Sequence, residues 1–194
     1  MIILMNGPPG SGKDMAATFF KKDLPNAAEL KMSKPLKDCF RTMFNFGDIQ
    51  SRTMLNELKD QSQAALNGLT PREVQILLYD WMRNLFGDDV LAQAFIREIN
   101  ITPANYIIVT DGGMQVEDDA LVNHIGRKSV KCIQLSRPGC NFDKDSRSYL
   151  DCSALGIDMI KIHNEHELPL YRRQLQRAWI KWGLPVRESA QKLG

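Results

Sequence analysis

Short, largely apolar runs alternate with longer amphipathic stretches along this chain. The runs occupy residues 2–5, 106–109, 130–135 and 159–162, and a weaker one occupies residues 28–33. Runs of this length, bounded by turn residues, are typical of strands that are buried on both faces. Segments with helical spacing of apolar residues separate them. This alternation predicts an α/β fold with a parallel sheet covered by helices on both sides.

Helices are predicted where apolar residues recur three and four positions apart. We expect them over residues 13–22, 35–45, 50–66, 71–86, 88–99 and 168–182, and one more that ends at Gly126 and turns Val116 inward. The clearest start is Thr70-Pro71-Arg72-Glu73, a capping box with proline at the first helical position. The apolar side of the helix that it opens is predicted to be buried, and it comprises Val74, Leu77, Leu78, Trp81 and Leu85.

The order of these elements predicts one domain with additions. The domain is expected to cover residues 1–183, with a helical insertion over about residues 35–100 and a polar segment over about residues 136–152. The polar segment has proline and glycine at its base and few apolar residues. It is therefore expected to act as a mobile lid, because a segment with little to bury opens at low free-energy cost. Residues 184–194 are predicted to form a frayed polar tail.

Composition narrows the class of protein. The 194 residues are 43% hydrophobic and 25% charged, and 25 basic against 23 acidic residues give a net charge of +2. These values exclude disorder as the main state and disfavour nucleic acid as a partner, because nucleic-acid binders carry a larger basic excess. No apolar run is long enough to span a bilayer, and residues 1–5 lack the features of a signal peptide. The four scattered cysteines are interpreted as reduced thiols of a cytoplasmic protein with no membrane partner.

A glycine-rich loop follows the first predicted strand. Its pattern is Gly-x-x-x-x-Gly-Lys, and a helix is predicted directly after it. Such a loop turns successive backbone N–H groups toward phosphate oxygens, and the start of the helix adds positive potential. The residues expected to bind phosphate are Gly7, Gly10, Ser11, Gly12, Lys13 and Asp14. The alternative interpretation is a glycine-rich turn that binds no ligand.

Two carboxylates are candidates for metal or acceptor contacts. Asp14 stands where phosphate loops usually have a hydroxyl that binds Mg²⁺, so it is a candidate Mg²⁺ ligand, either directly or through water. Alternatively, Asp14 only favours the first turn of its helix. Asp111 ends a buried strand, at the edge where open parallel sheets bind ligands. Its alternative role is to cap the turn at Gly112.

The predicted lid carries three cations. Arg137 stands at its base, and Lys144 and Arg147 lie within it. A basic segment that closes over phosphates supplies positive charge to the transferring group and excludes water. We therefore expect Arg137 and Arg147 to take part in catalysis.

The helix after Thr70 presents a second, polar face. Arg72, Gln75, Tyr79 and Arg83 share it at spacings of three, four and seven residues. These side chains are candidates for binding the phosphate and base of an acceptor, but the spacing is equally typical of a solvated helix face. His163 and His166 stand three residues apart at a strand-to-helix turn with no further ligand cluster, so we do not predict a metal site there.

With these elements placed, the chain resembles the deoxynucleoside monophosphate kinases of tailed bacteriophages, a branch of the P-loop kinases. Each similar block is short, and their order over about residues 1–180 is the specific signal. The blocks are Ser11-Gly12-Lys13-Asp14, Lys34-Pro35-Leu36-Lys37 with Met43-Phe44-Asn45-Phe46-Gly47, Thr70-Pro71-Arg72-Glu73 with Arg83-Asn84-Leu85-Phe86-Gly87, the strand ending at Asp111, and Arg137-Pro138-Gly139 with Asp145-Ser146-Arg147.

The resemblance implies a three-layer P-loop kinase fold with a five-stranded parallel sheet, a helical acceptor-binding insertion and a polar lid. It implies ATP with Mg²⁺ as donor, a deoxynucleoside monophosphate as acceptor, a homodimer, and the host cytoplasm as location if the protein is phage-encoded. Lys13, Asp111, Arg137 and Arg147 are then expected in catalysis. Lys37 joins Arg72, Gln75, Tyr79 and Arg83 as a candidate for acceptor binding.

One position departs from the family pattern. Many relatives have an arginine two residues after the strand-end aspartate, and this chain has Gly113 there. If that arginine serves the acceptor or the transferring phosphate, another cation must replace it or activity is weaker. Arg127, Arg137 and Arg147 are the candidates.

Two other functions remain open at this stage. The Gly-Lys-Asp loop also resembles that of animal phosphomevalonate kinase, whose acceptor is a phosphorylated alcohol. A nucleotide-binding switch or scaffold without transfer activity is the third hypothesis, and the glycine at position 113 is compatible with it. A panel of acceptors separates the first two, and slow hydrolysis without a phosphorylated product favours the third.

Overall fold

A computed structural model describes residues 1–143, 145–165 and 167–185 of the chain. The chain divides into two compact units. Unit 1 comprises Met1–Lys31 and Ile96–Gly194, and unit 2 comprises Met32–Phe95. Most of the predicted tail, residues 186–194, lies outside the described residues.

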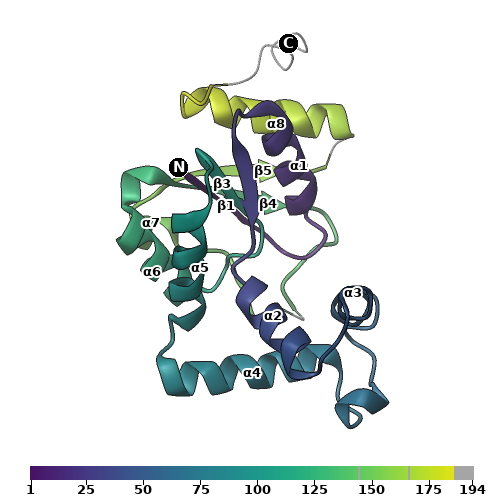
Figure 1. The fold of residues 1–194 in the computed structure, drawn as a ribbon. Helices are drawn as coiled ribbons and strands as arrows, with labels where there is room; N and C mark the ends of the chain where they lie inside the picture. The colour runs from purple at the N-terminus through teal and green to yellow at the C-terminus, as the bar shows by residue number, and fades with distance from the viewer. Residues whose placement is uncertain (144, 166, 186–194) are drawn as a thin grey trace. The chain divides into compact units, whose positions relative to one another are not determined.

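Unit 1 is built on a five-stranded parallel sheet with the order β2-β3-β1-β4-β5, as the figure shows (Figure 1). The strands are β1 (Ile2–Asn6), β2 (Ala27–Leu30), β3 (Tyr106–Val109), β4 (Val130–Ser136) and β5 (Asp158–His163). All four pairings between neighbours are parallel, and Leu4 of β1 stands opposite Val109 and Cys132. The α/β fold class is thereby confirmed. The second strand is shorter than predicted, because it ends at Leu30.

Helices cover both faces of this sheet. The helices with described bounds that lie wholly in unit 1 are α1 (Lys13–Asp23), α6 (Gln115–Ile125), α7 (Cys152–Leu155) and α8 (Leu168–Lys181), together with the short 3-10 helix η2 (Arg127–Ser129). Figure 1 shows α1 and α8 on one side of the sheet and α6 on the other. The helix α5 (Val90–Ile101) begins in unit 2 and ends in unit 1.

The main core lies between the sheet and the α1–α8 layer. Alternate strand residues such as Ile3 and Met5 face it, because successive side chains of a strand point to opposite faces. On the helix side, Phe20 of α1 packs edge-on against Trp179 of α8, with ring centroids 4.8 Å apart. Neither ring is accessible to solvent. This packing fixes α1, and α1 carries the glycine-rich loop at its start.

Unit 2 consists of helices. They are α2 (Lys34–Met43), α3 (Asp48–Asn56), the short 3-10 helix η1 (Ala64–Leu66) and α4 (Pro71–Phe86), followed by the first part of α5. The predicted helix over residues 50–66 is confirmed only as far as Asn56 and is wrong beyond it. The chain leaves the helix at Asn56, and the N–H groups of Gln63 and Gly68 bond within a loop, to the carbonyls of Leu69 and Gln63.

Two predictions of buried helix faces also need correction. In α4, Val74 and Leu78 are buried, but Leu77, Trp81 and Leu85 are each more than half exposed. In α6, Val116 is exposed, and the inward residues of the first turn are Glu117 and Asp118. Spacing along a helix defines an apolar stripe, but the neighbouring elements decide how much of the stripe is covered. Among the described residues, no helix is both long and apolar enough to cross a membrane.

The predicted capping box is present at the start of α4. The Glu73 N–H donates to the Thr70 hydroxyl at 3.1 Å, and the Thr70 N–H donates to a Glu73 carboxylate oxygen at 2.7 Å. The bond from the Thr70 N–H, together with a hydrogen bond from the Thr70 side chain, lowers the pKa of the Glu73 carboxyl below its ordinary value. The box therefore satisfies two N–H groups that the first turn of a helix leaves without partners.

Replacing Thr70 tests this capping box. Thr70→Ala should lower the free energy of unfolding of unit 2 by about 1 kcal/mol, because the hydroxyl acceptor is lost. Urea unfolding followed by circular dichroism measures the change. Thr70→Ser keeps the hydroxyl and serves as the matched control. Equal stability of the two variants would contradict a role for the hydroxyl.

Candidate phosphate-binding site

The glycine-rich loop runs from the end of β1 to the start of α1. Gly12 precedes the helix with a φ of +105°, a conformation that favours glycine. A Cβ atom at this position would lie 2.6 Å from the side-chain nitrogen of Asn164. The loop can therefore bend tightly toward α8 only because this residue is glycine. Gly7, Gly10 and Ser11 lie in the same bend, as predicted.

Two residues far along the chain hold this loop. Asn164 donates to the Ser11 carbonyl at 3.0 Å, and the Tyr171 hydroxyl donates to the Gly12 carbonyl at 3.1 Å. The Ser11 N–H donates to the Pro8 carbonyl at 3.2 Å. Sequence reasoning missed Asn164 and Tyr171. Asn164 follows β5, so the rule that polar residues at strand ends approach the ligand edge was the available signal.

Lys13 lies over its own loop. Its ammonium donates to the Gly7 carbonyl at 2.6 Å and to the Pro8 carbonyl at 2.7 Å. Burial lowers the pKa of Lys13 to about 8, and the positive charge of Arg147 acts in the same direction. A lysine whose ammonium form is disfavoured by burial and by a neighbouring cation stands in a place that favours an anionic ligand.

Both described lid arginines reach this region. Arg137 donates to the Gly10 carbonyl at 3.2 Å. Arg147 donates to the Asp111 carbonyl at 3.5 Å, and its guanidinium pairs with both carboxylate oxygens of Asp145, at 2.8 and 2.5 Å. That pairing raises the pKa of Arg147. The third predicted cation, Lys144, lies outside the described residues.

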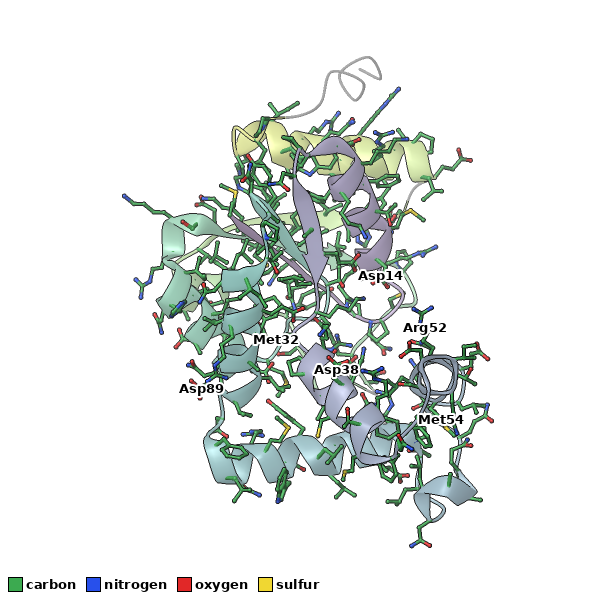
Figure 2. All side chains as sticks on the ribbon, viewed as in Figure 1. Asp14, Met32, Asp38, Arg52, Met54 and Asp89 are labelled. Atoms are coloured by element: carbon green, nitrogen blue, oxygen red, sulfur yellow. The ribbon has the colours of Figure 1, made fainter. Side chains whose placement is uncertain are left out.

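Acidic residues and a further lysine surround the start of α1. Asp14 is 83% exposed in its side chain, and Figure 2 labels it at the first turn of the helix. Lys31, which follows β2, lies 3.0 Å from an Asp14 carboxylate oxygen and 3.5 Å from one of Glu29. Burial opposes the effect, but the bond with Asp14 and the charges of Glu29 and Asp111 together raise the pKa of Lys31. Lys31 belongs to no motif and was not predicted as a site residue.

A buried carboxyl supports the turn that carries Asp111. Asp118, from the first turn of α6, accepts the Gly113 N–H at 2.8 Å. This carboxyl is almost fully enclosed, and burial raises its pKa to about 7. The turn after β3 is therefore held by a side chain that sequence analysis did not single out.

The carboxylates near the glycine-rich loop fit Mg²⁺ only when the phosphate oxygens of a bound nucleotide complete its coordination. Among the described residues, no group of three or more histidine, cysteine or acidic side chains is placed to hold a metal ion. Mg²⁺ is commonly bound by one or two carboxylates together with phosphate oxygens and waters. Asp14 and Asp111 are the residues of this chain that would hold the ion beside a bound nucleotide.

The acceptor candidates of unit 2 are engaged in local contacts. Arg72 pairs with Asp60, with 2.5 Å between Nε and Oδ1. Arg83 pairs with Asp88 at 2.5 Å, and its guanidinium lies 5.4 Å from the centre of the Tyr79 ring. Two other candidates complete the set: Gln75, which donates to the Pro71 carbonyl at 3.1 Å, and Lys37, which lies on α2. The structure brings Tyr79 and Arg83 together as the spacing predicted.

Three arginines are candidates to replace the arginine that many relatives have at position 113, and the surroundings of Gly113 distinguish between them. A Cβ atom on Gly113 would lie 3.0 Å from the Cβ of Arg147. Arg127 lies on η2, which precedes β4, and so it stands at the amino edge of the parallel sheet, opposite the loop. Arg147 is therefore the cation whose backbone lies directly beside position 113.

Comparisons with known proteins give limited similarity. No protein-family model matches the chain, and no curated protein is similar to it in sequence. A tunicamycin resistance protein of Deinococcus radiodurans is similar in structure, with a TM-score of 0.48, 10% identity, and coverage of 95% of this chain and 96% of that one. An unliganded sugar kinase from Janibacter sp. HTCC2649 is similar with a TM-score of 0.39 and 18% identity, and the match covers 93% of this chain and 92% of that one. A chain of the Pnkp1/Rnl/Hen1 complex is similar with a TM-score of 0.36 and 13% identity, and the match covers 94% of this chain and 75% of that one. At this level of similarity the fold class rests on the strand order of the sheet, and the resemblance to phage nucleotide kinases stays a prediction.

Titration of Lys13 tests the electrostatics of the site. In the ligand-free protein the Lys13 ammonium should titrate near pH 8, as followed by heteronuclear NMR of the lysine side chains. Arg147→Met should raise this pKa, because the variant removes a positive charge that disfavours the ammonium form. Arg127→Met, at the opposite edge of the sheet, is the matched control and should leave it unchanged. Equal pKa values in the wild type and in Arg147→Met would contradict the placement of Arg147 beside Lys13.

Proposed function

We propose that this chain is an ATP-dependent phosphotransferase, and that its acceptor is a nucleoside monophosphate, of the deoxy series as the sequence resemblance implies. The observation that carries the proposal is the arrangement of three cations: Lys13 and Arg137 bond the glycine-rich loop, and Arg147 bonds the Asp111 carbonyl at the neighbouring strand end and acts on the charge of Lys13. A loop that only turns the chain does not require three cations around it.

Each part has a separate task in this proposal. Backbone N–H groups of residues 10–13 and the start of α1 bind the phosphates of ATP, and Lys13 leaves its loop carbonyls to bind the outer phosphates. Arg147 then stabilises the charge that develops on the transferring group, since its guanidinium already lies against Asp111. Mg²⁺, when bound at Asp14 and Asp111, neutralises phosphate charge. No covalent intermediate with the protein is needed.

The acceptor is assigned to the polar face of α4. Arg72 and Arg83 offer guanidinium groups, which suit phosphate, and the Tyr79 ring offers a surface on which a base can stack. Both arginines are paired with exposed carboxylates, and exposed pairs of this kind are weak. A phosphate with two negative charges can therefore displace Asp60 and Asp88.

Removing Lys13 is the direct test of the loop. Lys13→Ala should lower kcat by at least about a hundredfold with the fold retained, because charge stabilisation of the transferring phosphate is lost. A coupled assay with ATP and Mg²⁺ against the common deoxynucleoside and ribonucleoside monophosphates measures this. The matched control is Lys22→Ala, at an exposed position in the last turn of the same helix.

Three results of this assay would contradict parts of the proposal. Unchanged turnover in Lys13→Ala, with normal thermal unfolding, would show that the loop is not the phosphate site. Transfer only to a phosphorylated alcohol would retain the phosphotransferase and reject the nucleotide acceptor. Slow ATP hydrolysis by the wild type, with no phosphorylated product from any acceptor, would indicate a nucleotide-binding protein without transfer activity.

Substitution of Arg72 tests the acceptor site. Arg72→Ala should raise the KM for the acceptor about tenfold or more and leave the KM for ATP unchanged, because a hydrogen bond between charged groups contributes about 1.5–3 kcal/mol. Steady-state kinetics with each substrate varied in turn measure the two constants. Arg52→Ala, an exposed arginine of α3 labelled in Figure 2, is the control. An effect confined to the KM for ATP would move the acceptor away from α4.

A further inference from the structure

The residues that follow Arg147 are bound to the ends of two strands through two buried amides. Asn6, the last residue of β1, donates from its side chain to the Ser148 carbonyl at 2.9 Å and accepts the Leu150 N–H at 2.9 Å. Gln134 of β4 donates to the Leu150 carbonyl at 2.7 Å. We call Asn6 and Gln134 the amide pair. Together they satisfy both backbone groups of Leu150 and one of Ser148.

Further bonds support the same short segment. The Ser148 N–H donates to the Gly113 carbonyl at 3.2 Å, and the Tyr149 hydroxyl donates to the Leu135 carbonyl at 3.0 Å. The lid residues 148–150 are thus tied to β1, β4 and the turn after β3. This anchoring differs from the lid predicted over about residues 136–152, which was expected to be mobile along its whole length.

Both side chains of the amide pair are buried, and the lid backbone is their main hydrogen-bond partner. Asn6 is 1% exposed and ends an otherwise apolar strand, and Gln134 is 7% exposed and stands between the buried residues Ile133 and Leu135. A buried amide without partners costs free energy, so an apolar residue would be the simpler choice for the core. The strong bonds of both side chains go to the lid backbone, since the bond between the two amides themselves is 3.4 Å long.

The same segment leaves no room for a side chain at position 113. A Cβ atom there would lie 3.0 Å from the Cβ of Arg147, 3.2 Å from the Asn6 side-chain nitrogen and 3.3 Å from the Ser148 carbonyl. Gly113 also has a φ of +135°. The close approach of the lid to the turn after β3 therefore depends on glycine at 113 and on the amide pair together.

We propose that Asn6, assisted by Gln134, is a positioning residue that holds Arg147, and hence its guanidinium beside Asp111, in place before substrates bind. The proposal rests on the proposed phosphotransferase function. Arg147 precedes the first anchored carbonyl by one residue, so fixing Ser148 and Leu150 fixes the point from which its side chain starts. A preorganised cation stabilises developing charge without the cost of ordering a loop during the reaction.

The effect should fall on turnover and act through Arg147. Asn6→Leu removes the amide at similar size and should lower kcat about tenfold or more with the KM for ATP unchanged, because misplacing a catalytic group by about 1 Å has effects of this order. In an Arg147→Met background, Asn6→Leu should cause no further fall in kcat. A merely structural defect would instead lower kcat by the same factor in both backgrounds.

Two further variants guard against misfolding and nonspecific effects. Gln134→Met removes one bond to Leu150 and leaves Asn6 in place, so it should give a smaller effect of the same kind. Gln115 bonds the backbone of Asp151 beyond the anchored segment, accepting the N–H at 2.9 Å. Gln115→Ala is the matched control and should leave kcat unchanged.

Hydrogen exchange separates failure of this inference from failure of the proposed function. Exchange at the amides of residues 148–150 should be at least about tenfold faster in Asn6→Leu than in the wild type, with no substrate present. Equal exchange, or an unchanged kcat in an active enzyme, would overturn the positioning role alone. No transfer by the wild type to any acceptor would overturn the proposed function and the catalytic part of this inference, and exchange would still decide whether Asn6 anchors the segment.

Discussion

Polar groups buried at the carboxyl edge of the sheet impose the constraint on which the candidate site depends. A buried amide or hydroxyl must find a hydrogen-bond partner, and at this edge the available partners are the backbones of loops. Asn164 and Tyr171 therefore bind the glycine-rich loop, and Asn6 and Gln134 bind the lid. The lid is thus held by side chains of β1 and β4, and the glycine-rich loop by side chains that follow β5 and lie in α8.

Local sequence was sufficient for the elements whose signals are local. The strands are short apolar runs, the glycine-rich loop has a defined spacing, and the capping box at Thr70 lies within four consecutive residues. The helix predicted over residues 50–66 was extended too far, beyond Asn56, because the polar composition of this segment carries no strong period. In the structure, the chain beyond Asn56 is organised by hydrogen bonds between loop residues, which no helical pattern reveals.

The candidate site was predictable where a residue belongs to a motif and not where it only converges in space. Lys13 and Asp111 were found because each has a recognisable place after a strand. Lys31 and Asn6 were not, because their neighbours in sequence resemble those of any strand end. Trp81, on the apolar side of α4, is a further example. A helical pattern predicts which side of a helix is apolar, but it does not predict whether another element packs against that side.

The burial of Trp179 gives the two units different optical properties. Its indole is enclosed beside Phe20 in unit 1, whereas Trp81 of unit 2 is 55% exposed. The fluorescence of a buried indole shifts to longer wavelength when water reaches it, and that of an indole already in water changes little. Emission from α8, where Trp182 is a partly buried neighbour, thus reports the loosening of the layer that supports the glycine-rich loop. The chain therefore carries an intrinsic spectroscopic probe of the α1–α8 layer that needs no bound nucleotide.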